Sequence, residues 1–296
     1  MLHAFEMRNM KYQGADIYVT SDVLVGSGMS SSAMFELLIG VIMNEHCNNN
    51  AIDAVELAKM AQYAENVYFN KPCGLMDQMA ISVGGFCTID FKDSNNIQIK
   101  KIDYDFEKSG YAFCIIDTLS SHDDLTSDYA AIPQEMKEVA THFDKKILSE
   151  VNEDDFYQAL PNLKQMNTRS LLRAMHYFNE NHVVDKEVQA LQANDFDTFL
   201  QGITASGNSS FKYLQNIYSL SSPFTQGVSF ALALSEHFLQ GKGACRVHGG
   251  GFAGTIEAFV PKDALTMYKE NMERELGKDS VHVLSIRPIG PIKVTE

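Results

Sequence analysis

Two glycines and three consecutive serines stand together in the segment Gly26-Ser-Gly-Met-Ser-Ser-Ser-Ala33, directly before an apolar stretch with helical spacing. The start of a helix presents unpaired N–H groups and partial positive charge, and glycines let the backbone wrap an anion. Serine hydroxyls add donors, and one hydroxyl can coordinate a Mg²⁺ ion held by phosphates. The segment matches neither GxxxxGK[ST] nor GxGxxG. It is equally typical of a flexible turn with a serine N-cap, so spacing alone leaves both interpretations open.

Two carboxylates, Glu65 and Asp77, lie twelve residues apart along the chain. Glu65 falls on a predicted helix, and Asp77 follows a turn signal formed by Pro72 and Gly74. Such a pair alone is typical of surface charge. If both approach the glycine-serine segment, one can hold a metal ion beside ATP and the other can accept a hydroxyl proton.

A third glycine-rich segment, Gly249-Gly-Gly-Phe-Ala-Gly254, follows Arg246-Val-His248 and precedes a predicted strand. Consecutive glycines allow positive φ angles and close approach of another backbone. The segment is consistent with a tight structural turn or with a loop that lines a site. We predict that His248 is a spacer rather than a metal ligand or a base.

These segments, in this order, resemble the motifs of the GHMP small-molecule kinases, and within them the galactokinase branch. Leu24 to Glu36 is similar to P-L-G-x-G-L-S-S-S-A-x-L-E, and Gly74-Leu-Met-Asp-Gln78 to G-I-M-D-Q. Arg246 to Gly254 is similar to R-M-T-G-G-G-F-G-G. Weaker matches are Thr126-Ser-Asp-Tyr129 to S-S-E-Y and Arg173 to Glu180 to R-x-x-H-x-x-x-E. The resemblance covers the chain from about residue 14 to its end.

The resemblance implies ligands for ATP and Mg²⁺. The implied contacts to the ATP phosphates come from the glycine-serine loop: Gly26, Ser27, Gly28, Met29, Ser30, Ser31 and Ser32. Ser32 and Glu65 are the implied ligands of Mg²⁺.

The resemblance also implies the residues that act on the sugar. Asp77 is the implied proton acceptor facing the C1 hydroxyl, and Gly74, Asp77 and Tyr129 are the implied sugar contacts. The implied active-site glycine loop consists of Gly249, Gly250 and Gly251. The implied reaction is ATP-dependent phosphorylation of a hexose at C1, converting galactose to galactose 1-phosphate.

The family's first motif, G-R-V-N-L-I-G-E-H-T-D-Y, has no counterpart in the 25 residues before Gly26. In the family that motif supplies an Arg near the transferred phosphate and the Glu, His and Asp that bind the sugar hydroxyls. We therefore expect a truncated first domain and an incomplete sugar site. Two alternatives stay open: a non-catalytic relative that binds a ligand or a partner, and a GHMP kinase for another sugar such as N-acetylgalactosamine or arabinose.

The resemblance implies an α+β fold with two domains. Residues 1–120 would form a truncated, ribosomal-S5-like ATP-binding domain, and residues 121–296 a ferredoxin-like domain. Patterning independently favours α+β, because strands and helices come first and mainly helices follow, ending in a β-α-β arrangement.

Several elements must position these segments. The predicted strands are Ala15–Val25, Gly85–Phe91, Ile97–Tyr104, Tyr111–Thr118 and Val281–Ile286. One more strand is predicted within residues 244–260, directly after the glycine turn in that range. The predicted helices include 34–43, 53–69 with a cap at Asn49, Asn50 or Asp53, a short helix after Gly74, most of 129–218, and 261–275.

Composition narrows the possible partners. The 296 residues include 38 acidic and 24 basic side chains, a net charge of −14. This charge argues against duplex nucleic acid and anionic membranes as partners, and no apolar run is long enough to span a bilayer. The five cysteines form no CxxC pair, which indicates reduced thiols in the cytoplasm. We expect a small-molecule sugar as partner; the sequence does not predict an oligomeric state.

Overall fold

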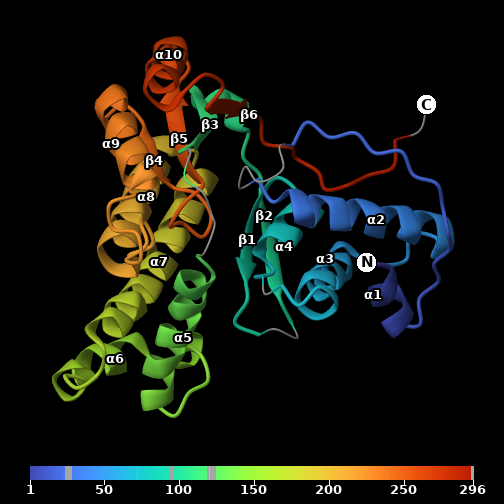
Figure 1. Cartoon of the computed structure of the whole chain (residues 1–296), viewed down its shortest axis with the longest axis horizontal. Helices are drawn as coiled ribbons and strands as arrows, with labels where there is room; N and C mark the ends of the chain where they lie inside the picture. Colours follow the sequence, from blue (N-terminus) through green and yellow to red (C-terminus); the bar gives the residue numbers. More distant parts are fainter. Residues whose placement is uncertain (24–28, 72, 94–95, 119, 121–124, 295–296) are drawn as a thin grey trace. The chain divides into compact units, whose positions relative to one another are not determined.

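The chain divides into two compact units, residues 1–103 with 286–296 and residues 104–285 (Figure 1). The computed structural model describes residues 1–23, 29–71, 73–93, 96–118, 120 and 125–294. The domain boundary at residue 120 that we predict from the sequence assigns Tyr111–Thr118 to the first domain. In the structure this segment belongs to the second unit, because its strand pairs with strands there.

The first unit is built mainly from helices that share one apolar core. Its helical elements are α1 (Leu2–Met7), α2 (Ser31–Cys47), α3 (Ala54–Tyr63), a π-helix η1 (Ala64–Tyr68) and α4 (Met76–Val83). Phe5, Leu37 and Met60 are fully buried in this core. Asp53 caps α3, because its carboxylate accepts the Glu56 N–H at 2.8 Å. Of the three caps proposed from the sequence, the structure uses Asp53; α1 was not predicted.

The prediction of a strand at Ala15–Val25 is wrong for those of its residues that the structure describes. Residues 15–22 have no regular secondary structure and are exposed, and residues 24–25 lie outside the described part of the chain. A strand needs a partner for its backbone N–H and C=O groups. No described strand pairs with this segment, so alternating polarity alone was insufficient.

An antiparallel hairpin and the C-terminal segment complete the first unit. Strand β1 (Phe86–Asp90) pairs with β2 (Gln98–Ile102), with Phe86 opposite Ile102. The segment 286–294 returns to this unit, where the Gly85 N–H donates to the Arg287 carbonyl at 2.8 Å. Gly290 lies so close to α4 that a Cβ there would come within 2.0 Å of the Ser82 carbonyl oxygen.

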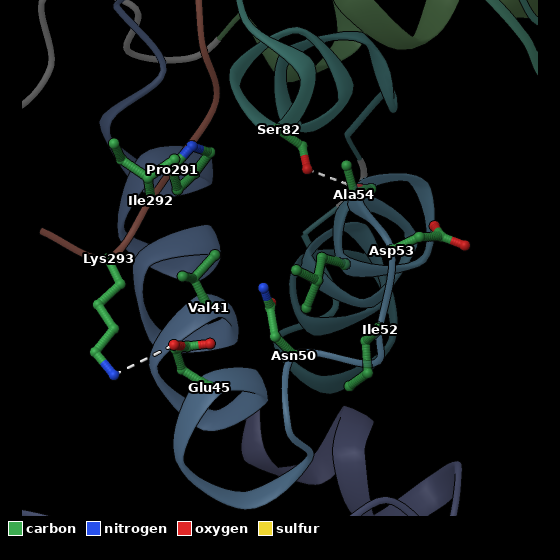
Figure 2. Close-up of a pocket in the computed structure, with 11 residues that line it drawn as sticks. Val41, Glu45, Asn50, Ile52, Asp53, Ala54, Ser82, Pro291, Ile292 and Lys293 are labelled. Carbon is green, nitrogen blue, oxygen red and sulfur yellow. Dashed lines mark hydrogen bonds and ion pairs between the residues drawn. The ribbon is translucent and has the colours of Figure 1, made fainter.

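The returning segment covers one side of a cavity of about 500 Å³ (Figure 2). Val41 and Glu45 of α2 and Ile52 before α3 line this cavity together with Ile292 and Lys293. The Lys293 ammonium lies 3.3 Å from the Glu45 carboxylate, so an ion pair fastens the segment to α2.

The second unit combines a sheet with a group of helices. In the described residues its strands are all antiparallel in the order β4-β5-β3-β6: β3 (Tyr111–Asp117), β4 (Ala244–Val247), β5 (Thr255–Pro261) and β6 (Val281–Leu284). The sequence predicts one strand after the glycine turn within residues 244–260. In the structure this turn joins two strands, β4 and β5. Ile116, Ile256 and Ala258 are fully buried in the core below this sheet.

The helices of the second unit account for most of residues 126–239 and one segment near the end. They are α5 (Thr126–His142), α6 (Glu153–Ala159), α7 (Thr168–Gln192), α8 (Phe196–Ser209), α9 (Gly227–Leu239) and α10 (Leu265–Leu276). Short turns are η2 (Phe106–Ser109), η3 (Leu148–Glu150), η4 (Leu160–Asn162) and a π-helix η5 (Ser210–Leu214). Helices α8 and α9 contact β4, and α10 contacts β5 and β6. The α+β class predicted from the sequence is confirmed.

A buried ion pair joins α5 to α7. Arg173 is 2% exposed, and its Nη1 lies 3.0 Å from Oε2 of Glu135. Arg169 binds the other oxygen of the same carboxylate at 2.5 Å. The carboxylate thus accepts hydrogen bonds from Arg169 and forms an ion pair with Arg173, which offsets the cost of burying it.

Candidate active site

Ser30 is the N-cap residue of α2, yet its side chain does not cap the helix. Its backbone is left-handed, with φ 53° and ψ 42°, a conformation that costs free energy for a residue other than glycine. The hydroxyl instead donates to Oδ2 of Asp77 at 2.6 Å. Ser30 thus combines a strained backbone with a hydroxyl that binds another residue instead of capping its own helix. Such strain is typical of a functional site.

Asp77 lies in the first turn of α4 and is exposed. The helix dipole places partial positive charge at this end of α4. Gly74 is also exposed, three residues before Asp77. The structure therefore brings Asp77 to the start of α2, as expected if it acts beside bound phosphates.

The first turn of α2 contains the remaining serines of the loop. Ser31 is its first residue, and Ser32 is exposed on the same turn. Met29 precedes Ser30 and is partly buried, whereas Gly26, Ser27 and Gly28 lie outside the described residues. The first N–H groups of a helix have no partner within it, so this turn offers donors to an anion.

Glu65 lies in the π-helix η1, where the sequence predicts an uninterrupted helix. Its side chain is only 6% exposed, and its Oε2 lies 3.1 Å from the Lys71 ammonium. Single π-turns inside helices often mark functional sites. The hydrophobic pattern of α3 continues through 64–68, so periodicity gave no signal for this turn.

Glu36 is a nearby carboxylate to which the sequence analysis assigned no role. It lies one turn after Ser32 on α2, so the two share a face of the helix. The pKa of Glu36 is raised to about 7, mainly because burial desolvates the carboxylate and also because of the charge of Glu65. A hydrogen bond from Gln78 and the charges of the N-terminus and Lys71 act in the opposite direction. Ser32, Glu36 and Glu65 therefore belong to one polar region of the first unit.

This region has the chemistry of a Mg²⁺ site that forms with a nucleotide. Mg²⁺ prefers oxygen ligands and is usually bound through one or two carboxylates plus substrate phosphates. Glu65 and Ser32 offer a carboxylate and a hydroxyl, and the buried Oε2 of Glu36 and Oε1 of Gln78 have no hydrogen-bond partner among the described residues. Within the described ranges no group of three or more His, Cys, Asp or Glu could hold a metal on its own. The ligand types present, a carboxylate and a hydroxyl, fit Mg²⁺, and its binding by Ser32 and Glu65 stays a prediction.

The second unit contains the glycine loop and Tyr129. The Tyr129 hydroxyl donates to the Gly251 carbonyl at 2.8 Å. The Asn216 amide donates to the Gly250 carbonyl at 3.1 Å, and the Phe252 N–H donates back to the Asn216 carbonyl. These contacts hold the loop from two sides.

Close contacts explain why this loop requires glycine. Gly251 has φ +80°, and a Cβ there would lie 2.1 Å from the Asn216 carbonyl oxygen. A Cβ on Gly250 would lie 2.8 Å from a ring carbon of Tyr129. The sequence predicted positive φ and close approach here but could not name Asn216 as the neighbour.

The residues around the loop form polar contacts inside the second unit. His248 bonds Thr255 through Nδ1 and Oγ1 at 3.1 Å. Arg246 lies 3.5 Å from Glu180 and 3.8 Å from Glu257. The candidate site residues therefore form two groups, one in each unit.

Comparison with known proteins identifies the family. The family model described as GHMP kinases N terminal domain matches residues 1–85. The galactokinase of Glaesserella parasuis is 31% identical over 269 residues, covering 90% of this chain and 67% of that protein. The chain belongs to the galactokinase family of GHMP kinases. The family resemblance predicted from the motifs is confirmed.

Other galactokinases and GHMP proteins support this assignment. The galactokinase of Thermotoga neapolitana is 30% identical over 273 residues, covering 92% of this chain and 73% of that protein. A crystal structure of Lactococcus lactis galactokinase complexed with galactose matches with a TM-score of 0.72 at 24% identity, covering 92% of this chain and 69% of that chain. L. major mevalonate kinase matches at a TM-score of 0.55 and 14% identity. These structures establish the shared fold.

In the described part of the chain no helix is both long enough and apolar enough to cross a bilayer.

Proposed function

We propose that this chain transfers the γ-phosphoryl group of ATP to the C1 hydroxyl of galactose. The hydrogen bond from Ser30 to Asp77 is the observation that carries the proposal. It places a carboxylate at the start of α2, where backbone N–H groups and serine hydroxyls can bind phosphates. The relatives named galactokinase and the matching galactokinase complexed with galactose support this substrate.

Phosphoryl transfer depends mainly on positioning and on neutralising charge. The first turn of α2, with Ser30, Ser31 and Ser32, binds the phosphates in this proposal. Ser32 and Glu65 would hold Mg²⁺, which neutralises charge on the phosphates when it is bound. The acidic chain thus binds a polyanion through backbone amides and a cation rather than through a basic surface.

Asp77 accepts the proton that leaves the C1 hydroxyl in this mechanism. Ser30 orients the carboxylate by donating to Oδ2, which leaves Oδ1 to receive the proton. Gly74, Asp77 and Tyr129 are the proposed sugar contacts. The bond from Tyr129 to Gly251 gives the tyrosine a second role, because it holds the carbonyl of the glycine loop.

The proposed location is the cytoplasm. Among the described residues all five cysteines are free thiols, as expected for a reducing compartment. Burial raises the pKa of the Cys114 thiol to about 12 and that of Cys245 to about 11. These buried thiols remain protonated and unreactive at neutral pH.

The test is ADP release by the purified chain, coupled to NADH oxidation, with a panel of acceptors. Galactose, N-acetylgalactosamine, arabinose, mevalonate and homoserine are compared at equal concentrations with MgATP. The proposal predicts turnover with galactose above the others. Galactose binding by calorimetry without ADP release would instead support a non-catalytic relative, and preference for another acceptor would reassign the substrate.

A further inference from the structure

Lys71 is a cation beside the proposed metal ligand, and the reaction outlined above does not use it. Its backbone N–H donates to the Glu65 carbonyl at 2.9 Å, and its ammonium lies 3.1 Å from Oε2 of Glu65. Asn70, between them in the turn, has φ +54°. The turn after η1 therefore returns the chain toward Glu65 and places the ammonium on its carboxylate.

The two partners of this ion pair differ in their exposure to water. The Glu65 side chain is 6% exposed, whereas the Lys71 side chain is 66% exposed. A buried carboxylate requires a counter-charge, because isolated burial of an ion is costly. An exposed ammonium loses little when it moves into solvent, because water replaces its partner. The lysine can leave, provided another cation takes its place.

The polar side chains around Glu65 favour the binding of a second cation beside its carboxylate. Glu36 lies near enough to interact electrostatically with both Glu65 and Lys71. The Gln78 amide donates toward the Cys73 sulfur at 3.6 Å, while its buried Oε1 has no hydrogen-bond partner in the part of the chain that the structure describes. The region thus contains two carboxyl groups that interact with one ammonium, and the Gln78 side chain interacts with one of these carboxyl groups.

We propose that Lys71 is an internal counter-ion that occupies the Glu65 oxygen until Mg²⁺ binds, and that it competes with the metal for that oxygen. This inference rests on the proposed function, because it takes Glu65 as a metal ligand. On metal binding the Glu65–Lys71 ion pair breaks and the ammonium moves into solvent. Lys71 thereby keeps the buried carboxylate neutralised in the free protein and lowers its affinity for the metal alone.

The experiment is a Mn²⁺ titration of the full chain without nucleotide, followed by the loss of the free-ion electron paramagnetic resonance signal. Removing the competing charge in Lys71→Met should tighten Mn²⁺ binding by about 3- to 10-fold. Lys71→Arg keeps the charge and should bind Mn²⁺ like the wild type. Lys92→Met removes an exposed lysine of the same unit and should also change nothing. Unchanged or weaker binding in Lys71→Met would overturn the proposal.

Glu65→Gln separates this inference from the proposed function. If Glu65→Gln binds Mn²⁺ as tightly as the wild type, Glu65 is not a ligand and the metal site itself is wrongly assigned. If Glu65→Gln weakens binding while Lys71→Met has no effect, only the role of Lys71 fails. A thermal unfolding series provides a second measurement: Mg²⁺ should raise the melting temperature of Lys71→Met more than that of the wild type. An equal rise in both proteins would contradict the competition.

Discussion

The Ser30 hydroxyl donates a hydrogen bond of 2.6 Å to Oδ2 of Asp77. The two residues are 47 positions apart; Ser30 is the N-cap residue of α2 and Asp77 lies in the first turn of α4. Because Ser30 holds a left-handed backbone and leaves α2 without a side-chain cap, local stability alone does not explain this geometry. Positioning of the Asp77 carboxylate does explain it.

Ser30→Ala should lower kcat by about 10-fold, because the Ser30 hydroxyl orients the Asp77 carboxylate and misplaced catalytic groups slow transfer. The melting temperature should hardly change, since the side chain does not cap α2. Steady-state kinetics and thermal unfolding measure both quantities. Ser21→Ala removes a hydroxyl whose hydrogen bonds within the described residues are to Val23 in its own turn. It is the control and should keep the wild-type rate. A wild-type rate in Ser30→Ala would remove the positioning role.

Gly251→Ala should destabilise the second unit by about 2 kcal/mol or more, because it combines a positive φ with a steric clash. The new Cβ would lie 2.1 Å from the Asn216 carbonyl oxygen. Gly241→Ala is the matched control, because Gly241 has φ +75° and no atom within 4 Å of a Cβ. Urea unfolding of both variants isolates the clash from the backbone strain. Equal loss in both would mean that the Asn216 contact is not tight.

Glu187→Gln should make stability less dependent on pH. The pKa of Glu187 is raised from 4.5 to about 7, mainly by desolvation; Arg246 opposes this shift, and Glu180 and Glu257 contribute to it. The folded protein therefore retains a proton that the unfolded chain releases, so stability falls as pH rises from about 4.5 to about 7. The neutral amide avoids this loss, so Glu187→Gln should gain of the order of 1–3 kcal/mol at pH 8 relative to pH 4.5.

Urea unfolding at several pH values measures that difference against the wild type. Glu270 is an exposed residue of the same unit. The stability of Glu270→Gln should therefore change with pH in the same way as that of the wild type. A pH-independent difference between Glu187→Gln and the wild type would contradict the raised pKa of Glu187.

Glu135→Gln should cost about 3–5 kcal/mol, because it leaves the buried Arg173 without its counter-charge. Glu107→Gln breaks the ion pair with Lys262, whose partners are 70% and 46% exposed, and should cost no more than about 1 kcal/mol. Denaturant unfolding of the two variants compares a buried with an exposed pair. Similar losses would show that burial does not decide the strength of these pairs.

Sequence patterns predicted those structural features that depend on residues close together in the chain. The cap at Asp53 and the glycine conformations at 249–251 follow from local backbone chemistry. The strand predicted at Ala15–Val25 failed because strands depend on a partner that alternation cannot reveal. The π-turn at Glu65 interrupts a helix whose hydrophobic pattern does not change.

Contacts between residues far apart in the sequence could not be predicted from local sequence patterns. The bond from Tyr129 to Gly251 joins residues 122 positions apart, and the motif resemblance placed both in the site without predicting their contact. Glu36 was quoted only as the last residue of a motif. Its raised pKa depends on burial and on Glu65, which only the folded chain reveals. The roles of Gly26, Ser27 and Gly28 stay predictions outside the described residues.

The most direct test is transfer of ³²P from γ-labelled ATP to galactose by the wild type and Asp77→Asn, side by side. The account predicts labelled galactose 1-phosphate from the wild type. Asp77→Asn should form it about 10²–10⁴ times more slowly, because general base catalysis contributes about that factor. Binding of a fluorescent ATP analogue should be the same in both proteins. Equal rates of transfer in the two proteins, or no transfer to galactose by the wild type, would contradict the account.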